Sequence, residues 1–259
     1  MRFERATLDF EGAVAILTLD HREAMNAASV EMLGGLNAAL TVIEEEERVR
    51  CILLTGAGRA FCSGANLQGG RDAIGNVAEL LDTVYHPFLL RLRRIDCPFI
   101  TVVNGPAAGA GMTLALMGDM ILCGRSAYFL QAFRRIGLVP DSGSTWVLPR
   151  LIGRARALEL SLMGERLSAE KALEWGLVNR VYDDAVLMEE ALKLAQELAR
   201  GPTIALSLTR RLYWESMENS YEQQLRLECE SQAVAAAAED FREGVAAFLA
   251  KRPATFTGK

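Results

Sequence analysis

At the start of the chain, apolar residues first alternate with polar ones, as in a strand, and then recur every three to four residues, as on one face of a helix. They alternate with polar residues in Ala6–Phe10 and Val14–Leu19, on either side of Gly12, which predicts two short strands joined by a turn. Across Ala27–Ile43 they recur at the spacing of one helix face, and Ser29 is a candidate N-cap for that helix. The chain therefore opens with a β-β-α unit.

Continuous apolar runs predict buried strands farther along. Two of them, Cys51–Thr55 and Phe99–Val103, are separated by a glycine-rich stretch and by a helical pattern over Val77–Ile95. The pattern then predicts, in chain order, a helix over Gly109–Gly118, strands over Met120–Cys123 and Tyr128–Gln131, and a helix over Thr145–Leu151. This alternation of strands and helices favours an α/β core built from ββα units.

From about residue 154 the pattern becomes mainly helical. The predicted helices cover Ala155–Met163, Ser168–Trp175, Ala185–Arg200, Thr203–Met217 and a last stretch from Tyr221 to about Lys251, with a strand-like segment at Leu177–Tyr182. We therefore expect an α/β core over residues 1–200 and a helical region over residues 201–259. About 60 residues bury too little surface to fold alone, so this region should pack on the core or on a neighbouring subunit.

Composition excludes several classes of protein. The 28 basic and 33 acidic residues give a net charge of −5, and the three arginines Arg91, Arg93 and Arg94 are too few on an acidic chain to predict nucleic-acid binding. The longest apolar stretch, Pro98–Leu122, is broken by polar residues and glycines and does not predict a membrane span. The first residues do not resemble an export signal, so we expect a cytoplasmic protein.

Cysteines and histidines indicate neither disulfides nor a metal. The five cysteines show no CxxC spacing, and Cys51, Cys97 and Cys123 lie in or beside apolar runs, which is typical of reduced, buried thiols. Two histidines are too few for a His-rich zinc site. The glycine pair at Gly56 and Gly58 lacks the third glycine of a dinucleotide fingerprint, and no GxSxG nucleophile motif is present.

Two turns of small residues are the main candidates for a binding site. Each follows a buried strand: residues 60–67 read AFCSGANL and residues 104–111 read NGPAAGAG. Small side chains allow a ligand close to the backbone, and two N–H groups that converge on one oxygen form an oxyanion hole. Tight turns also require glycine, so the spacing alone leaves both interpretations open.

Four blocks of sequence together resemble the enoyl-CoA hydratase/isomerase (crotonase) superfamily. They are AFCSGANL, VNGPAAGAGMTLALMGDM, GLVPDSGSTWVLPRLIG and RLSAEKALEWGLVNRV, and the likeness extends from about Val14 to Phe256. The resemblance implies a spiral of ββα units with a C-terminal helical region that takes part in trimerisation. It also implies an acyl-CoA thioester as substrate, no separate cofactor, and a homotrimer or a dimer of trimers.

The resemblance assigns roles to individual residues. Backbone N–H groups of Ala65 and Ala110 would stabilise a thioester enolate, the backbone around Ser63 would hold the adenine end, and Arg22 and Lys251 would contact phosphates. The acyl-CoA-binding positions implied in this way are Arg22, Ala24, Ser63, Gly64, Ala65, Asn66, Leu67, Gly109, Ala110, Phe133 and Lys251.

The sequence departs from the hydratase pattern at both catalytic positions. Thr113 and Phe133 stand where hydratases of this family carry two glutamates, and an acid occurs instead at Asp141. That position resembles the catalytic aspartate of dienoyl-CoA isomerases and of the ring-epoxide and enoyl-CoA isomerases of phenylacetate degradation. The likeness is closest to the last group.

The chemistry favours the same conclusion. Hydration needs one group to activate water and another to protonate carbon, whereas a double-bond shift needs a single base that removes and returns a proton. We expect a desolvated Asp141 with a raised pKa. The expected surroundings of this side chain are Phe133, Leu138, Val139, Pro140 and Trp146.

Three alternatives remain open from the sequence. Asp141 could instead cap the helix that follows it, an interaction worth about 1 kcal/mol. A hydratase, hydrolase or lyase would require a second acid, for which residues 71–82 are the local source. A non-catalytic relative would bind acyl-CoA without turning it over.

Overall fold

The computed structural model describes residues 1–66 and 76–259 and has a seven-stranded sheet at its centre. The sheet has the order β1-β2-β3-β4-β5-β7-β10; β1 to β3 are antiparallel, and β3 to β10 run parallel to one another. Its strands are β1 (Arg2–Phe3), β2 (Ala6–Glu11), β3 (Val14–Leu19), β4 (Cys51–Gly56), β5 (Phe99–Val103), β7 (Met120–Gly124) and β10 (Arg180–Tyr182). The mixed α/β fold expected from the sequence is therefore confirmed.

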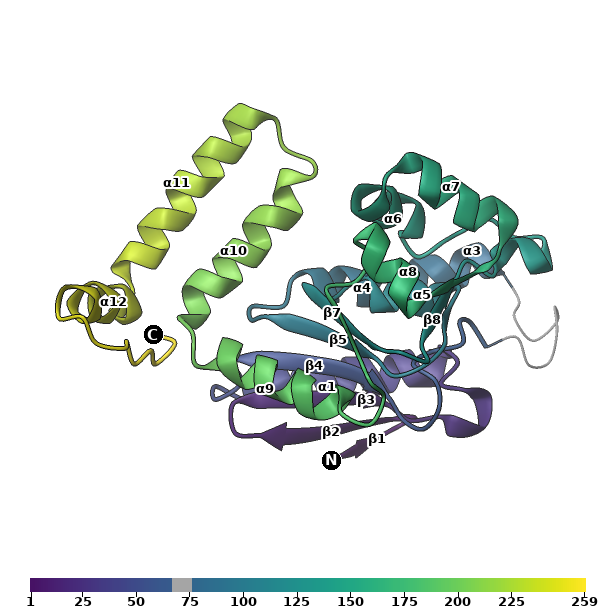
Figure 1. Ribbon diagram of the computed structural model, residues 1–259, viewed down its shortest axis with the longest axis horizontal. Coiled ribbons are helices and arrows are strands. Elements are labelled where there is room, and N and C mark those ends of the chain that lie inside the picture. Colours follow the sequence, from purple (N-terminus) through teal and green to yellow (C-terminus); the bar gives the residue numbers. More distant parts are fainter. Residues whose placement is uncertain (67–75) are drawn as a thin grey trace.

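Helices cover both faces of this sheet (Figure 1). The helices and helical turns of the core are η1 (Arg22–Ala24), α1 (Val30–Glu45), α3 (Val77–Leu80), η2 (Leu81–Tyr85), α4 (His86–Arg93), α5 (Ala110–Ala115), η3 (Phe133–Ile136), α6 (Ser144–Ile152), α7 (Arg154–Met163), α8 (Ala169–Trp175) and α9 (Leu187–Ala199). In β4, Ile52 and Leu54 belong to the hydrophobic cluster that includes α1 and α4, whereas Leu53 belongs to the cluster that includes α9. Because both faces are covered, the central strands read as continuous apolar runs.

A second, smaller sheet supports the two small-residue turns. It has the order β6-β8-β9, formed by β6 (Ala107–Ala108), β8 (Tyr128–Leu130) and β9 (Arg166–Ser168). Cys62, in the first turn, forms an isolated parallel bridge with Ala107 at the start of the second turn. The sequence did not predict β6 or β9, because segments of two or three residues show no usable periodicity.

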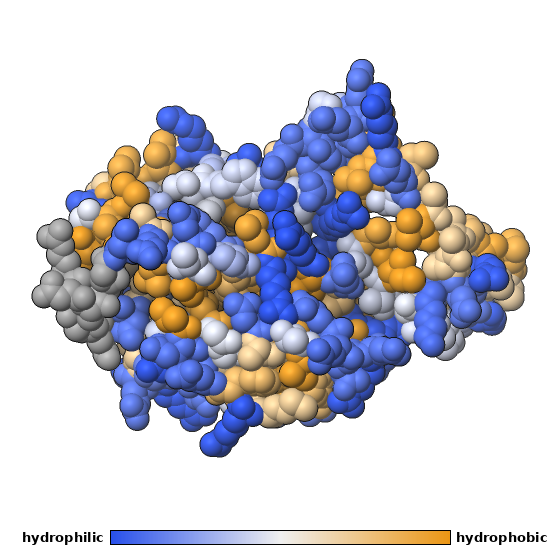
Figure 2. Space-filling model, turned by 180° about the vertical axis from the view of Figure 1, so that it is seen from behind, coloured by the Kyte–Doolittle hydropathy of each residue, from blue (hydrophilic) through white to orange (hydrophobic). Residues whose placement is uncertain are grey.

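The last three helices extend away from the core as an arm (Figure 1). They are α10 (Thr203–Ser216), α11 (Tyr221–Ala237) and α12 (Glu239–Leu249). Apolar side chains remain exposed on the arm, including Phe248, which is 83% exposed, and Leu249, which is 75% exposed. Figure 2 shows apolar surface gathered at this end of the molecule.

Two predicted helices differ from the observed ones. The helix predicted over Ala27–Ile43 begins only at Val30, because the backbone of Ala28 is extended and bridges Ala65. Ser29 caps it as expected, since its side chain accepts a hydrogen bond from the N–H of Met32. The stretch predicted from Tyr221 to about Lys251 is two helices rather than one, because Ala238 is extended.

The cysteines and the membrane prediction can be compared directly with the structure. Cys51, Cys97 and Cys123 are buried free thiols, as predicted, and so is Cys62, whereas Cys229 is exposed. Within residues 1–66 and 76–259, no helix combines the length and apolar character that a membrane crossing requires.

Candidate active site

The two small-residue turns touch at a pair of glycines. Gly64 and Gly109 have φ angles of +102° and +51°, a region that L-residues with side chains rarely adopt. A Cβ on Gly64 would lie 2.9 Å from the carbonyl oxygen of Ala108, and a Cβ on Gly109 would lie 3.9 Å from Cα of Gly64. Gly64 is therefore required by the close approach and Gly109 is favoured by its positive φ, and the following residues, Ala65 and Ala110, line the same cavity.

The backbone N–H groups of these two alanines are not used by the fold. In the bridge between Ala28 and Ala65, Ala28 donates to Gly64 and Asn66 donates to Ala28, so the N–H of Ala65 takes no part in it. Ala110 is the first residue of α5, where an N–H has no partner within the helix. No carbonyl in the described part of the chain is recorded as accepting from either group. The turns thus offer two free donors.

Both donors border a cavity of about 380 Å³. One side is polar backbone from the two turns, and the other is a wall of apolar and aromatic side chains. The wall consists of Val30, Val77, Leu80, Leu81, Tyr85, Phe133, Ile136 and Leu138. A cavity with a few polar groups on one side and an apolar wall on the other can fix a thioester while it encloses an acyl chain.

Asp141 lines the same cavity. Its carboxylate is half-buried, and Oδ1 accepts one hydrogen bond of 2.8 Å from the hydroxyl of Ser142. Burial raises the pKa of Asp141, while the Ser142 hydrogen bond and the nearby His86 act in the opposite direction. A carboxyl with a raised pKa is a stronger base once ionised, which suits removal of a proton from carbon.

The alternative role for Asp141 as a helix cap is wrong. Gly143 is the N-cap residue of α6, and no side chain caps this helix. The N–H of Ser144 bonds to the backbone carbonyl of Asp141 rather than to its carboxylate. The side chain of Asp141 is therefore not needed to begin the helix.

The surroundings of Asp141 are partly different from those predicted. Phe133 and Leu138 line the cavity, but Val139, Pro140 and Trp146 do not. Val139 is 78% exposed. Trp146 instead stacks on Trp214 of α10, with ring centroids 6.0 Å apart. The side chain of Val139 faces solvent rather than the cavity, which a continuous apolar run does not reveal.

The structure brings together most of the predicted binding residues. Those that line the cavity are Ser63, Gly64, Ala65, Asn66, Gly109, Ala110 and Phe133. Ala24 lies beside them without lining the cavity, since its carbonyl accepts a 3.1 Å hydrogen bond from the hydroxyl of Ser63. Leu67 lies outside the described residues.

Two predicted phosphate contacts lie outside the cavity. Arg22 is exposed and forms an ion pair of 3.1 Å with Asp20. Lys251 follows α12, at the opposite end of the molecule from the cavity (Figure 1). Within one chain, Lys251 therefore does not meet the other predicted residues.

The positions that carry glutamates in hydratases of the resembling family contain no acid. Thr113 is fully buried in α5, and its hydroxyl has no hydrogen-bond partner among the described residues. The ring of Phe133 lies against Gly109, 3.8 Å from where a Cβ would stand. Of the residues considered as a second acid, Asp82 bonds to His86 on the outside of the helix.

Sequence reasoning missed a second carboxylate at the rim of the cavity. Glu31, in the first turn of α1, lines the cavity and forms a 3.0 Å ion pair with Arg5. A hydrogen bond from Ser29 lowers the pKa of Glu31, which favours its ionised form. Glu31 therefore differs from Asp141 in both exposure and charge compensation, and its place after a capping serine gave no sign of a site.

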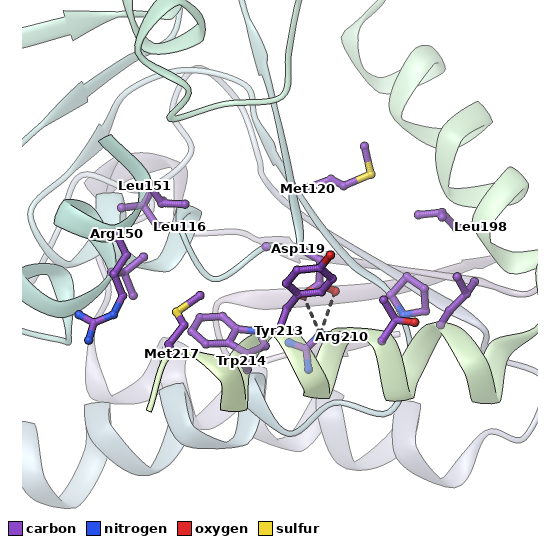
Figure 3. Close-up of a pocket in the computed structure, with 15 residues that line it drawn as sticks. Leu116, Asp119, Met120, Arg150, Leu151, Leu198, Arg210, Tyr213, Trp214 and Met217 are labelled. Carbon is purple, nitrogen blue, oxygen red and sulfur yellow. Dashed lines mark hydrogen bonds and ion pairs between the residues drawn. The ribbon is translucent and has the colours of Figure 1, made fainter. Parts of the chain in front are cut away.

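A second cavity, of about 350 Å³, lies between α6, α9 and α10 (Figure 3). Its acid, Asp119, accepts 2.8 Å hydrogen bonds from Nε of Arg210 and from the N–H of Phe99. Arg210 also donates to carbonyls at the end of α4, namely those of Leu92, Arg93 and Ile95. Because these groups satisfy one another, they join α10 to the core and leave no carboxylate available for catalysis.

Two exposed arginines, Arg134 and Arg135, connect the segment around Phe133 to the end of α7. Arg134 donates to the carbonyls of Leu162 and Met163, and Arg135 donates to the carbonyl of Gly164. These bonds join η3, which carries Phe133, to the end of α7. They help to place one wall of the cavity.

Comparison with known proteins agrees with the mixed α/β fold. A family model described as enoyl-CoA hydratase/isomerase matches residues 9–259. The chain is 46% identical to 1,2-epoxyphenylacetyl-CoA isomerase from Escherichia coli K12, over 96% of this chain and 97% of that one. It is also 40% identical to a probable enoyl-CoA hydratase from Rhodobacter capsulatus over the full length of both.

Solved structures show the same fold. The crystal structure of enoyl-CoA hydratase from Bacillus anthracis is 30% identical, with a TM-score of 0.92 over 98% of this chain and all of that one. The chain therefore belongs to the enoyl-CoA hydratase/isomerase (crotonase) family, and the resemblance seen in its four sequence blocks is confirmed. It is an acyl-CoA enzyme of that family.

Proposed function

We propose that the protein is an acyl-CoA isomerase that acts through a thioester enolate, on an enoyl-CoA double bond or on a ring-epoxide acyl-CoA. The observation that carries the proposal is a single half-buried carboxylate, Asp141, in the cavity that also holds two free backbone donors. The similarity to an epoxyphenylacetyl-CoA isomerase supports the same reaction class.

The mechanism for an enoyl-CoA follows from these groups. Asp141, ionised, removes a proton from the carbon between the double bond and the thioester carbonyl, and the electron pair moves onto the thioester oxygen. The N–H groups of Ala65 and Ala110 stabilise that oxyanion, each by roughly 3–4 kcal/mol. Protonated Asp141 then returns the proton to the far carbon, which moves the double bond into conjugation. Neither water nor a second acid is consumed.

Hydration is the second candidate function, because a relative with 40% identity bears a hydratase name. Within the described residues that line the cavity, Glu31 is the carboxylate that could assist Asp141. Its ion pair with Arg5 and its lowered pKa disfavour a role as proton donor. Exchange of Glu31 for glutamine separates the two candidates, since only a hydratase would depend on it.

The test is incubation with a 3-enoyl-CoA and a 2-enoyl-CoA in heavy water, followed by mass spectrometry. We expect a 2-enoyl product from the 3-enoyl substrate with no added water, and with deuterium on carbon to the extent that protonated Asp141 exchanges with solvent before it returns the proton. A product heavier by one water would establish hydration instead. Binding without turnover of enoyl, aromatic and ring-epoxide thioesters would leave an acyl-CoA-binding role.

We also propose that the arm over residues 201–259 assembles the protein into a trimer or a dimer of trimers. Exposed apolar side chains such as Phe248 and Leu249 are expensive to leave in water and are suited to contact with a second copy. In such an assembly Lys251 would reach the CoA phosphates of a neighbouring subunit. Light scattering, with Phe248→Glu as the disrupting variant, tests the assembly.

A further inference from the structure

The helical segment that walls the cavity contains a π turn, and proline accounts for it. Residues Leu81–Tyr85 form the π turn η2, between α3 and α4. Pro87 lies at the start of α4 and has no N–H to donate to the carbonyl of Thr83, and its ring crowds that carbonyl. A wider turn relieves this conflict and also changes the direction of the side chains that follow. The last residue of the turn, Tyr85, points inward.

The hydroxyl of Tyr85 bonds to the backbone beside the predicted oxyanion hole. Tyr85 is only 5% exposed, and its Oη donates a 2.5 Å hydrogen bond to the carbonyl of Ala28. The same carbonyl accepts the N–H of Asn66, and the N–H of Ala28 donates to Gly64 at 2.7 Å. Ala28 thus holds the residues on both sides of Ala65, and Tyr85 holds Ala28.

We propose that Tyr85 is a positioning residue for the oxyanion hole, which fixes the direction of the Ala65 N–H through the carbonyl of Ala28. This inference rests on the proposed function. The ring of Tyr85 lines the cavity while its hydroxyl is engaged behind it. The side chain of Tyr85 therefore fixes the distance between the apolar wall of the cavity and the N–H group of Ala65.

The element that carries Tyr85 is rigid enough for this role. Arg210, whose side chain is 4% exposed, donates to the carbonyls of Leu92, Arg93 and Ile95 at the far end of the same helix. The helix is thus fixed at its C-terminal end by Arg210 and at its middle by Tyr85. Catalytic donors that are displaced by even a fraction of an ångström stabilise a transition state less well.

The hydroxyl contributes to geometry more than to folding. Without it the carbonyl of Ala28 still accepts the N–H of Asn66, so Tyr85→Phe leaves no buried acceptor without a partner. Burial raises the pKa of Tyr85, so the phenol remains a donor throughout the neutral range. Tyr85→Phe therefore tests the orientation of the Ala65 N–H with little effect on the stability of the fold.

The experiment compares Tyr85→Phe with Tyr182→Phe. Tyr182, on β10, also uses its hydroxyl in a hydrogen bond, which it accepts from Arg180, but it lies outside the cavity. For Tyr85→Phe we expect kcat for a 3-enoyl-CoA to fall roughly 10- to 100-fold with KM changed less than about threefold. Tyr182→Phe should match the wild type, and both variants should keep the melting temperature within a few degrees.

An infrared spectrum of bound cinnamoyl-CoA provides a readout that does not depend on turnover. Hydrogen bonds to its thioester oxygen lower the carbonyl stretching frequency, and we expect Tyr85→Phe to lose part of that shift at saturating ligand. An unchanged shift together with an unchanged kcat would overturn the positioning role.

The two proposals fail in distinguishable ways. If the wild type shifts the carbonyl band but does not isomerise any thioester, the proposed reaction is wrong, and the loss of the shift in Tyr85→Phe still supports the positioning role. If the wild type itself produces no shift, there is no oxyanion hole to position, and the inference is overturned.

Discussion

Asp119 and Asp141 are two partly buried carboxylates in one chain, and their surroundings differ. Burial raises the pKa of both. Asp119 accepts hydrogen bonds from Arg210 and from the N–H of Phe99, and both lower its pKa. The bond to Arg210 joins α10 to the core. Asp141 receives one hydroxyl, from Ser142, and faces an open cavity.

The difference teaches that burial alone does not identify a catalytic acid. What matters is whether the carboxylate retains an oxygen that the fold does not use, in a place that a ligand can reach. By that measure Asp119 connects α10 to the core, whereas Asp141 is the acid that we propose for catalysis.

The largest expected effect is loss of activity on Asp141→Asn. Removal of the only proposed base should lower kcat by roughly 10²- to 10⁴-fold, the usual contribution of general acid–base catalysis. Because burial disfavours the charge of Asp141, the free energy of unfolding should stay the same or rise slightly. Retained exchange of substrate protons in heavy water would remove Asp141 from the mechanism.

The converse change, Arg210→Met, should affect stability instead. It leaves the partly buried Asp119 without its cation and three backbone carbonyls without their donor, and we expect a loss of about 3–5 kcal/mol in the free energy of unfolding. The pKa of Asp119 would rise further, so this loss should be smaller at acid pH, where both folded and unfolded chains carry a protonated Asp119. Urea unfolding at two pH values measures it. Equal stability of variant and wild type would contradict the assignment of the pair as a joint.

A smaller effect is expected from Ser142→Ala. The Ser142 hydroxyl lowers the pKa of Asp141, so without it that pKa rises. Since the base must be ionised, the acid limb of the kcat/KM profile should move to higher pH. Ser161→Ala, which removes a hydroxyl from α7 outside the cavity, is the control and should leave the profile in place.

The smallest effect should come from Glu31→Gln. An exposed ion pair such as Glu31–Arg5 contributes about 0–1 kcal/mol, and the isomerase mechanism does not use this carboxylate. We expect activity within about twofold of the wild type in initial-rate assays and nearly the same melting temperature. A loss of hydration activity on this change would favour the hydratase.

The sequence was most informative where several residues share one constraint. Long apolar runs revealed the central strands, and Gly64 and Gly109 revealed the turns, because positive φ angles and, at Gly64, a close backbone approach favour glycine. It was least informative where a position depends on distant segments. The sequence around Glu31 does not indicate that it lies at the rim of the cavity, and the sequence around Val139 does not indicate that its side chain is exposed. Lys251 lies far from the cavity within one chain.

Ordinary mutagenesis does not test the backbone N–H groups of Ala65 and Ala110. Residues 65 and 110 are already alanine, so an alanine scan passes over both, and nearly any replacement there keeps the N–H group in place. Natural variation at these positions likewise reports on space rather than on the donor. Among the ordinary amino acids only proline lacks the N–H, and it also constrains the backbone. Replacement of the amide by an ester, through chemical synthesis or an expanded genetic code, deletes the N–H and leaves the side chain unchanged. The proposed oxyanion hole thus consists of main-chain groups, which most side-chain substitutions leave in place.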